Sequence, residues 1–138
     1  VSYLTRNNAK FQSPFFHEPE QVISKETADE MKRMLIKTVQ EGTGRSARIE
    51  GLEIGGKTGT AQIAGGTGYL KKYISSFVGF VNDDKGNSYT IGVTVINPNP
   101  IRPHYYAAQS AVPVFKEIIQ NLIKLNYLSP KEDINLEN

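Results

Sequence analysis

The chain has 138 residues, of which 38% are hydrophobic and 22% are charged, and its formal net charge is +2. This composition is typical of a single globular domain, or of part of a larger one, and excludes an intrinsically disordered chain. The basic residues are scattered among acidic ones, so we expect no nucleic-acid partner. The absence of cysteine excludes disulfides and thiolate zinc sites, and no apolar run approaches the roughly 20 residues of a membrane span.

The first half of the chain predicts one helix. Residues 1–23 contain two prolines and no clear period, so we expect an irregular lead-in. Residues 24–41 have the spacing of an amphipathic helix, with Ser24 as the N-cap. Asp29 is expected to pair with Arg33 one turn later.

Three strands are expected after this helix, at residues 52–63, 73–82 and 88–97. Turn signals at Ala64–Gly68 and Asp83–Asn87 separate them. Turns this short make neighbouring strands antiparallel. The second strand is apolar on both faces, which predicts a central position in the sheet.

A second helix is expected at about residues 107–125, and Pro113 indicates that it is either kinked or begins later. Residues 126–138 are expected to be a tail, and its polar stretch SPKEDINLEN, residues 129–138, is expected to be frayed. The element order predicts an α+β fold, with a three-stranded antiparallel sheet flanked by an N-terminal-side helix and a C-terminal helix. We expect residues 24–125 to form this helix–sheet–helix unit, with both helices on one face of the sheet.

The stretch GLEIGGKTGTAQIAGG, Gly51–Gly66, supports two hypotheses about Lys57. Its first eight residues match the phosphate-binding P-loop pattern G-x-x-x-x-G-K-[ST]. A P-loop needs a helix directly after its lysine, whereas glycine and β-branched residues follow Lys57 here. The turns between the strands are also too short for parallel crossovers. Both observations count against a P-loop, and nucleotide binding is kept only as the alternative hypothesis.

The other hypothesis keeps Lys57 on a strand. Side chains alternate along a strand, so Lys57 and Gly59 face one way, and Thr58 and Thr60 face the other. A strand edge with free N–H groups, a lysine and hydroxyls suits a peptide carboxylate and an oxyanion. Taken alone, the tripeptide Lys-Thr-Gly is equally compatible with an exposed strand lysine among ordinary β-forming residues.

The segment GTGRSARIEGLEIGGKTGTAQ closely resembles the segment before and through the Lys-Thr-Gly motif of one family, the class B penicillin-binding proteins. Several further segments resemble the same family, in the same order along the chain. YISSFVGFV and YTIGVTVINP resemble the following sheet strands, and YYAAQSAVPVFKEI resembles the C-terminal helix. The resemblance covers about residues 20–125. It implies a fold that is part of a penicillin-binding-protein/β-lactamase-like transpeptidase domain.

The resemblance also implies an activity. Such enzymes cross-link peptidoglycan: a serine attacks the D-Ala-D-Ala bond of a stem peptide, and an amine of a neighbouring peptide resolves the acyl-enzyme. β-Lactam antibiotics trap that serine. Carried over by motif position, Lys57 would support the proton network and the electrostatics around the serine. Thr58 and Thr60 would bind the substrate carboxylate through their hydroxyls, Gly59 would let the substrate lie against the strand, and the backbone N–H of Thr60 would be half of the oxyanion hole.

The resemblance therefore assigns Lys57 and Thr60 as catalytic, and Thr58, Gly59 and Thr60 as substrate-binding. The expected partners are the stem peptide and β-lactams. We expect no cofactor and no metal, because His17 and His104 lack metal-ligand spacing. The resemblance further implies a parent protein that is anchored in the bacterial inner membrane, with this domain facing the periplasm.

The nucleophile motif of the family does not occur among the 138 residues. None of the nine serines is followed by lysine at the third position or by asparagine at the second. We therefore expect residues 1–138, which begin with valine, to be the C-terminal portion of a transpeptidase domain whose N-terminal half is a partner. Alone, this piece is expected to be soluble and inactive, and to self-associate or need its other half. A non-catalytic partner-binding module is a further alternative.

Overall fold

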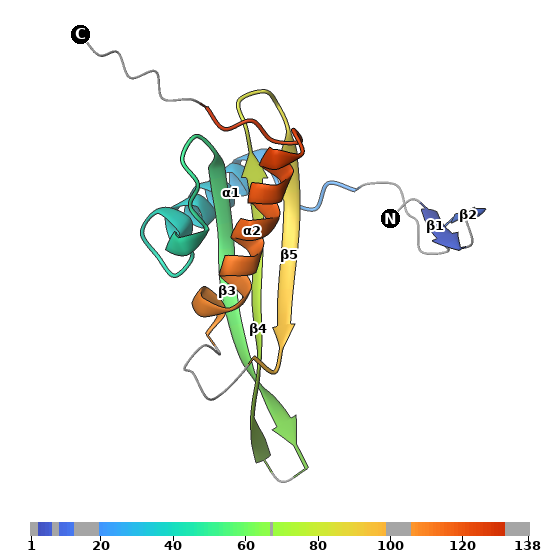
Figure 1. Cartoon of the computed structure of the whole chain (residues 1–138), viewed down its shortest axis with the longest axis vertical. Coiled ribbons are helices and arrows are strands. Elements are labelled where there is room, and N and C mark those ends of the chain that lie inside the picture. Colours follow the sequence, from blue (N-terminus) through green and yellow to red (C-terminus); the bar gives the residue numbers. More distant parts are fainter. Residues whose placement is uncertain (1–2, 7–8, 13–19, 67, 99–105, 132–138) are drawn as a thin grey trace.

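The computed structural model describes residues 3–6, 9–12, 20–66, 68–98 and 106–131. Two helices and a three-stranded sheet form its main body, and a separate antiparallel pair of short strands precedes them (Figure 1). The elements are β1 Tyr3–Arg6, β2 Ala9–Gln12, α1 Lys25–Gln40, β3 Glu53–Gly65, β4 Gly68–Asn82, β5 Ser88–Ile96 and α2 Ala111–Lys124, with single 3-10 turns η1 at Arg45–Ala47 and η2 at Ala107–Gln109.

The sheet has the order β3-β4-β5, and both strand pairs are antiparallel, as the short turns predicted. The central position of β4 is therefore confirmed. β3 and β4 are longer than expected, because the strands continue through most of the predicted turn and pair up to Gly65 and Gly68. The register shifts between Gln62 and Ala64. Beyond this irregularity, β3 and β4 project past the rest of the sheet as a two-stranded ribbon (Figure 1).

The two helices lie on opposite faces of the sheet, so the expectation that both cover one face was wrong (Figure 1). Phe77 and Phe80 are three residues apart on β4 and therefore point to opposite faces. Phe77 packs edge-on against Phe115 of α2, with 4.7 Å between ring centroids. Phe80 lines a hollow with residues of α1, and Lys32 of α1 lies over its ring. Because β4 carries apolar side chains on both faces, one helix packs against each face.

The buried core lies mainly between α2 and the sheet face that carries Phe77. It consists of apolar side chains from both helices, the three strands, the two 3-10 turns and the segment after α2, and its most buried aromatic residues are Phe77 and Phe115. Burying side chains of this size contributes about 1.5–3 kcal/mol each, which makes this face the main source of folding stability. The core members are Val39, Ala47, Ile54, Phe77, Val81, Val93, Ala107, Ala111, Val112, Phe115, Ile119 and Leu128.

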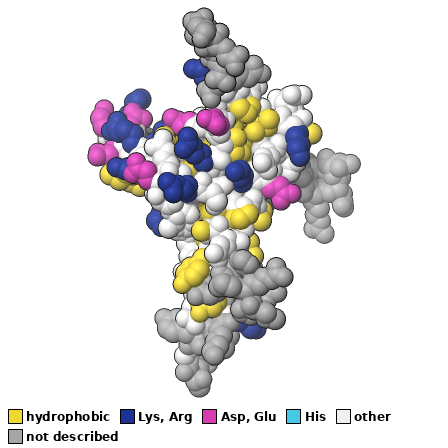
Figure 2. All heavy atoms as spheres, turned by 60° about the vertical axis from the view of Figure 1, so that its left-hand side comes forward, with side chains coloured by type: hydrophobic (Ala, Val, Ile, Leu, Met, Phe, Trp, Pro, Cys, Tyr) yellow, Lys and Arg dark blue, Asp and Glu magenta, His cyan; other side chains and the backbone are white. Residues whose placement is uncertain are grey.

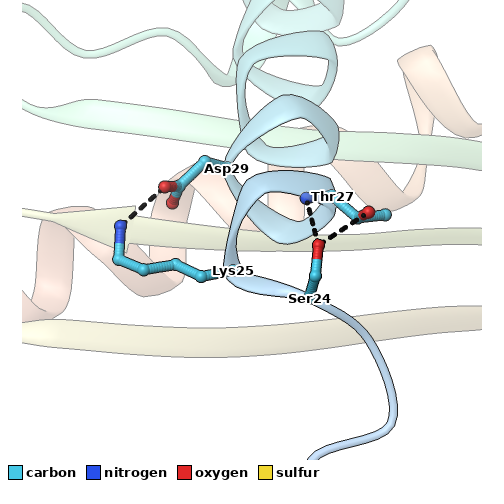
Figure 3. A network of polar contacts seen from close by, with 4 residues as sticks. All are labelled: Ser24, Lys25, Thr27 and Asp29. Carbon is cyan, nitrogen blue, oxygen red and sulfur yellow. Dashed lines mark hydrogen bonds and ion pairs between the residues drawn. The ribbon is translucent and has the colours of Figure 1, made fainter.

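Helix α1 begins as the sequence predicted. Ser24 is the N-cap, and its hydroxyl accepts a hydrogen bond of 3.2 Å from the backbone N–H of Thr27 (Figure 3). Asp29 pairs with Lys25 one turn earlier, at 2.7 Å, rather than with Arg33 as expected. Either basic residue is one turn away from Asp29, so sequence spacing could not distinguish them.

Helix α2 begins at Ala111, after the separate turn η2. Pro113 consequently lies in the first turn of the helix, where its missing N–H removes no intrahelical hydrogen bond. Of the two outcomes that the sequence left open, the later start is the one observed.

The segments outside the helix–sheet–helix unit are more ordered than expected. β1 and β2 pair within the predicted irregular lead-in. At the other end, Leu128 is buried, and Ser129 donates a backbone hydrogen bond to the carboxylate of Asp83. Lys131 donates another to the carbonyl of Gly51. Residues 126–131 therefore pack against the sheet end, and the expected fraying was wrong for residues 129–131. Residues 132–138 lie outside the described part.

The surface mixes charges of both signs. Figure 2 shows acidic and basic side chains intermingled, with apolar patches between them. Large apolar side chains are exposed at Met31 and Met34 of α1, and at Val78 and Ile96 of the sheet. In the described part of the chain, no helix has the length and apolar character needed to cross a membrane.

Candidate active site

The four residues Lys57, Thr58, Gly59 and Thr60 lie in the middle of β3. Their partners on β4 are Val78, Phe77, Ser76 and Ser75, in that order. The unbroken register confirms that Lys57 and Gly59 face one side of the sheet and Thr58 and Thr60 the other. The threonines lie on the α2 side, together with Phe77. The lysine lies on the α1 side, together with Phe80.

The outer edge of β3 is open at these residues. β3 is an edge strand, and no described strand pairs with its outer side. The carbonyl of Gly56 accepts a hydrogen bond from the hydroxyl of Thr38 in α1, so the backbone groups of Gly56 point away from β4. Backbone direction alternates along a strand, so Thr58 and Thr60 also turn their N–H and C=O groups outward. The backbone N–H of Thr60 is thereby directed to the side on which a ligand can approach.

Lys57 is exposed, and its ammonium group donates a 2.8 Å hydrogen bond to the carbonyl of Thr58. The side chain therefore curls around the strand toward the outer edge. This position brings a positive charge beside the outward backbone groups of Thr58 and Thr60, where it can attract an anion.

Each threonine hydroxyl has a partner within the protein. The Oγ1 of Thr58 lies 2.9 Å from the Oγ1 of Thr43, in the loop after α1. The Oγ1 of Thr60 accepts a 3.4 Å hydrogen bond from the backbone N–H of Ala107 in η2. Sequence reasoning missed both Thr43 and Ala107. A GTG tripeptide around Thr43 was the available signal, but its contact with Thr58 depends on the tertiary fold.

Gly59 has open space where a side chain would be. A Cβ atom built at Gly59 meets no heavy atom within 4 Å, whereas one at Gly56 would lie 2.8 Å from the Cε1 of Phe77. The strand surface is thus clear at Gly59 and occupied at Gly56. The clear position lies directly beside Lys57 on the same sheet face.

This geometry excludes the P-loop hypothesis. Lys57 and Thr58 are in the interior of a strand that continues to Gly65, so no helix N-terminus follows the lysine. The next strand is antiparallel, as the Gly59–Ser76 pairing shows, and this excludes a parallel crossover.

A hollow of about 640 Å³ lies away from these residues, near the start of β3 and the end of β4. Glu53 lines it and forms a 2.6 Å ion pair with Lys32. Hydrogen bonds from Lys32 and then Asn82 lower the pKa of Glu53. None of the residues from Lys57 to Thr60 lines this hollow. The described residues contain no cluster of three potential metal ligands, and His17 and His104 lie outside them.

The family model of the penicillin-binding-protein transpeptidase domain matches residues 6–120. The chain belongs to the penicillin-binding-protein transpeptidase family. Stage V sporulation protein D of Bacillus subtilis is 42% identical over 99 residues, which are 71% of this chain and 15% of that protein. The peptidoglycan D,D-transpeptidase FtsI of Buchnera aphidicola is 30% identical over 132 residues, which are 94% of this chain and 22% of that protein.

A solved structure agrees with this family. The transpeptidase domain of penicillin-binding protein 3 from Burkholderia pseudomallei has a TM-score of 0.66 and 30% identity, over 94% of this chain and 37% of that one. The likeness shows that the sheet and its two helices correspond to part of the fold of a penicillin-binding-protein transpeptidase domain. The 138 residues correspond to about a third of that domain and to a smaller share of the curated relatives.

Proposed function

We propose that this chain is the C-terminal portion of a peptidoglycan D,D-transpeptidase domain and contributes its Lys-Thr-Gly strand to the active site. The observation that carries the proposal is the open edge of β3 at Lys57–Thr60, where outward backbone groups, two hydroxyls and an ammonium lie together. Its membership of a D,D-transpeptidase family supports the same reaction class. The substrate is a stem peptide ending in D-Ala-D-Ala, and β-lactams are its mimics.

The site residues take the following roles. The hydroxyls of Thr58 and Thr60 donate hydrogen bonds to the carboxylate of the stem peptide or of the β-lactam. The backbone N–H of Thr60 is one donor of the oxyanion hole, and one such donor typically contributes about 10²–10³ in rate. Lys57 provides a positive charge for the carboxylate and for the proton network of the nucleophile. Gly59 leaves room for the substrate backbone along the strand.

The nucleophile comes from outside these 138 residues. No serine here has the Ser-x-x-Lys spacing of the family. Ser75, which pairs with Thr60 across the strands, is buried and hydrogen-bonded to Ser110. Ser76 is bonded to Thr94 on β5. Covalent catalysis needs a nucleophile with an activating base in reach, so the complete site requires the N-terminal half of the domain. In the parent protein we place this domain on the periplasmic side of a membrane anchor.

The test is acylation by a labelled penicillin, followed by intact mass. The isolated chain is expected to gain no mass. A longer form that also contains a Ser-x-x-Lys segment, or a mixture with a polypeptide that carries that segment, is expected to gain one opened β-lactam per chain. The same mixture with Lys57→Ala is expected to lose this labelling.

Two outcomes would contradict the proposal. A stable adduct on the isolated chain would mean that another residue acts as the nucleophile. No labelling of the longer form would favour a non-catalytic module in which the fold binds a partner. A nucleotide-binding assay on the isolated chain completes the comparison: no ATP affinity that depends on Lys57 is expected, because no helix N-terminus follows this lysine.

A further inference from the structure

The two threonine hydroxyls of the site differ in what their protein partners allow. A hydroxyl has one proton to donate and two lone pairs that can accept. Thr60 accepts from the N–H of Ala107, and a backbone N–H can only donate. The single proton of Thr60 is therefore not used in this contact and remains available to a ligand.

The contact between Thr58 and Thr43 is between two hydroxyls, either of which can be the donor. If Thr58 donated to Thr43, its proton would be occupied. If Thr43 donates to Thr58, the proton of Thr58 stays available, as it does for Thr60. A carboxylate is acceptor-only, so the proposed function requires Thr58 to donate to the ligand. The direction of the Thr43–Thr58 hydrogen bond therefore bears on anion binding.

Thr43 is held in a fixed place by the end of α1. The backbone N–H groups of Gly42 and Gly44, on either side of it, donate to the carbonyl of Thr38 at 3.0 and 3.1 Å. Gly44 is buried, and a Cβ there would lie 3.1 Å from Val39 and 3.3 Å from Phe77. The hydroxyl of Thr38 in turn bonds the carbonyl of Gly56, just before Lys57. One helix end thus anchors both the Thr43 loop and the strand.

We propose that Thr43 is a positioning residue of the anion site, which donates its proton to Thr58 and so orients the Thr58 proton toward the substrate carboxylate. The inference rests on the proposed function and adds to it a residue outside the Lys-Thr-Gly motif. Loss of the Thr43 hydroxyl leaves Thr58 without this donor, so its hydroxyl is free to rotate. Binding of an anionic substrate then weakens, whereas binding of an uncharged ester, which is a weaker hydrogen-bond acceptor, depends less on this proton.

The test uses the longer form that is acylated by penicillin. Thr43→Val has nearly the same shape and no hydroxyl, and Thr43→Ser restores the hydroxyl. Acylation rate constants are measured with benzylpenicillin, which has the carboxylate, and with its methyl ester, which does not. Thr94→Val is the matched control, because Thr94 also forms a hydroxyl–hydroxyl contact, with Ser76, but on β5.

With benzylpenicillin, Thr43→Val is expected to lower the second-order acylation rate constant about tenfold, at the lower end of the effect of one hydrogen bond to a charged group, because the Thr58 hydrogen bond to the carboxylate is weakened and not removed. With the ester, the same variant is expected to stay within about twofold of the parent form, since no charged acceptor is present. Thr43→Ser is expected to recover most of the rate with benzylpenicillin. The Thr94→Val control is expected to match the parent form with both compounds.

Each of the other outcomes contradicts a specific part of the inference. An equal loss with acid and ester would show that Thr43 only supports the strand, and an unchanged rate would show that it has no role. If thermal unfolding shows that Thr43→Val does not fold, Thr43→Ala and Thr43→Ser are compared instead. Equal ratios of the benzylpenicillin rate to the ester rate in these two variants would refute the inference. If the parent form itself is not acylated, the proposed function fails and the role of Thr43 fails with it.

Discussion

Gly56 and Gly59 lie three residues apart on β3, and replacement of each by alanine is expected to change folding stability in opposite directions. A Cβ at Gly56 would lie 2.8 Å from the Cε1 of Phe77 and 2.9 Å from the carbonyl oxygen of Val78. The first contact is with a fully buried ring that packs on Phe115, and the second is with the backbone of β4. Neither group can move without disturbing the core.

The magnitudes follow from these contacts. Overpacking in a filled core costs about 1–3 kcal/mol, so Gly56→Ala is expected to lose that amount of unfolding free energy. At Gly59 a Cβ meets nothing within 4 Å, and the φ angle is not in the left-handed region. Gly59→Ala then removes the entropic cost of a strand glycine, which is about 0.5–1 kcal/mol. The two variants are expected to differ by about 1.5–4 kcal/mol.

Urea unfolding of the 138-residue chain, followed by circular dichroism, measures both changes. Equal stabilities for Gly56→Ala and Gly59→Ala would refute the packing assigned to Phe77. Acylation in the longer form separates folding from function. There, Gly59→Ala is expected to slow acylation despite its stable fold, because the methyl group occupies the surface proposed for the substrate. An unchanged rate would remove Gly59 from the proposed site.

Two further predictions concern pH and association. Hydrogen bonds, first from the Asn87 side chain and then from backbone N–H groups, lower the pKa of Asp83 from 3.8 to about 2. Its carboxylate therefore stabilises the fold above about pH 4 and loses this effect as pH falls toward about 2. When urea unfolding is measured at a series of pH values between about 4 and 2, Asp83→Asn is expected to lose less unfolding free energy than the parent chain. An identical loss would contradict the role assigned to the Asp83 carboxylate. Val78 and Ile96 are 57% and 70% exposed on the α1 side of the sheet, so the isolated chain is expected to self-associate. Light scattering should report oligomers that diminish when both residues are replaced by serine, and a monomer at high concentration would refute this expectation.

The order of the sheet and the sheet faces of residues 57–60 were predictable for local reasons. Alternation along residues 88–97 indicated a half-buried strand, and Tyr89 and Val93 do face the core side there, with Ser88 and Thr90 exposed. The same alternation predicted that the side chain of Lys57 points to the opposite sheet face from the side chains of Thr58 and Thr60. Short turns at Asp83–Asn87 dictated antiparallel pairing, and the observed turn closes with a 3.0 Å backbone bond between these two residues.

Other features depended on contacts between distant residues. Helix α1 lies on the sheet face opposite α2, where its residues and Phe80 line the same hollow. The spacing of apolar residues within the two helices does not specify this position. The order at residues 126–131 depends on the Asp83 carboxylate and on Gly51, both far away in sequence. Sequence patterns record local periodicity and cannot register partners of this kind.

The sequence by itself determined which side chains share a strand face, because side-chain direction follows from the backbone period alone, and it favoured a strand over a helix after the lysine. Only the tertiary structure decided what surrounds them. It placed Thr43 against Thr58, 15 residues away, and Ala107 against Thr60, 47 residues away. It also left the outer edge of β3 open at these residues while Thr38 covers it at Gly56. Those relations arise when the helices pack on the sheet, since packing, and not local propensity, brings donors and acceptors of different elements within hydrogen-bonding distance.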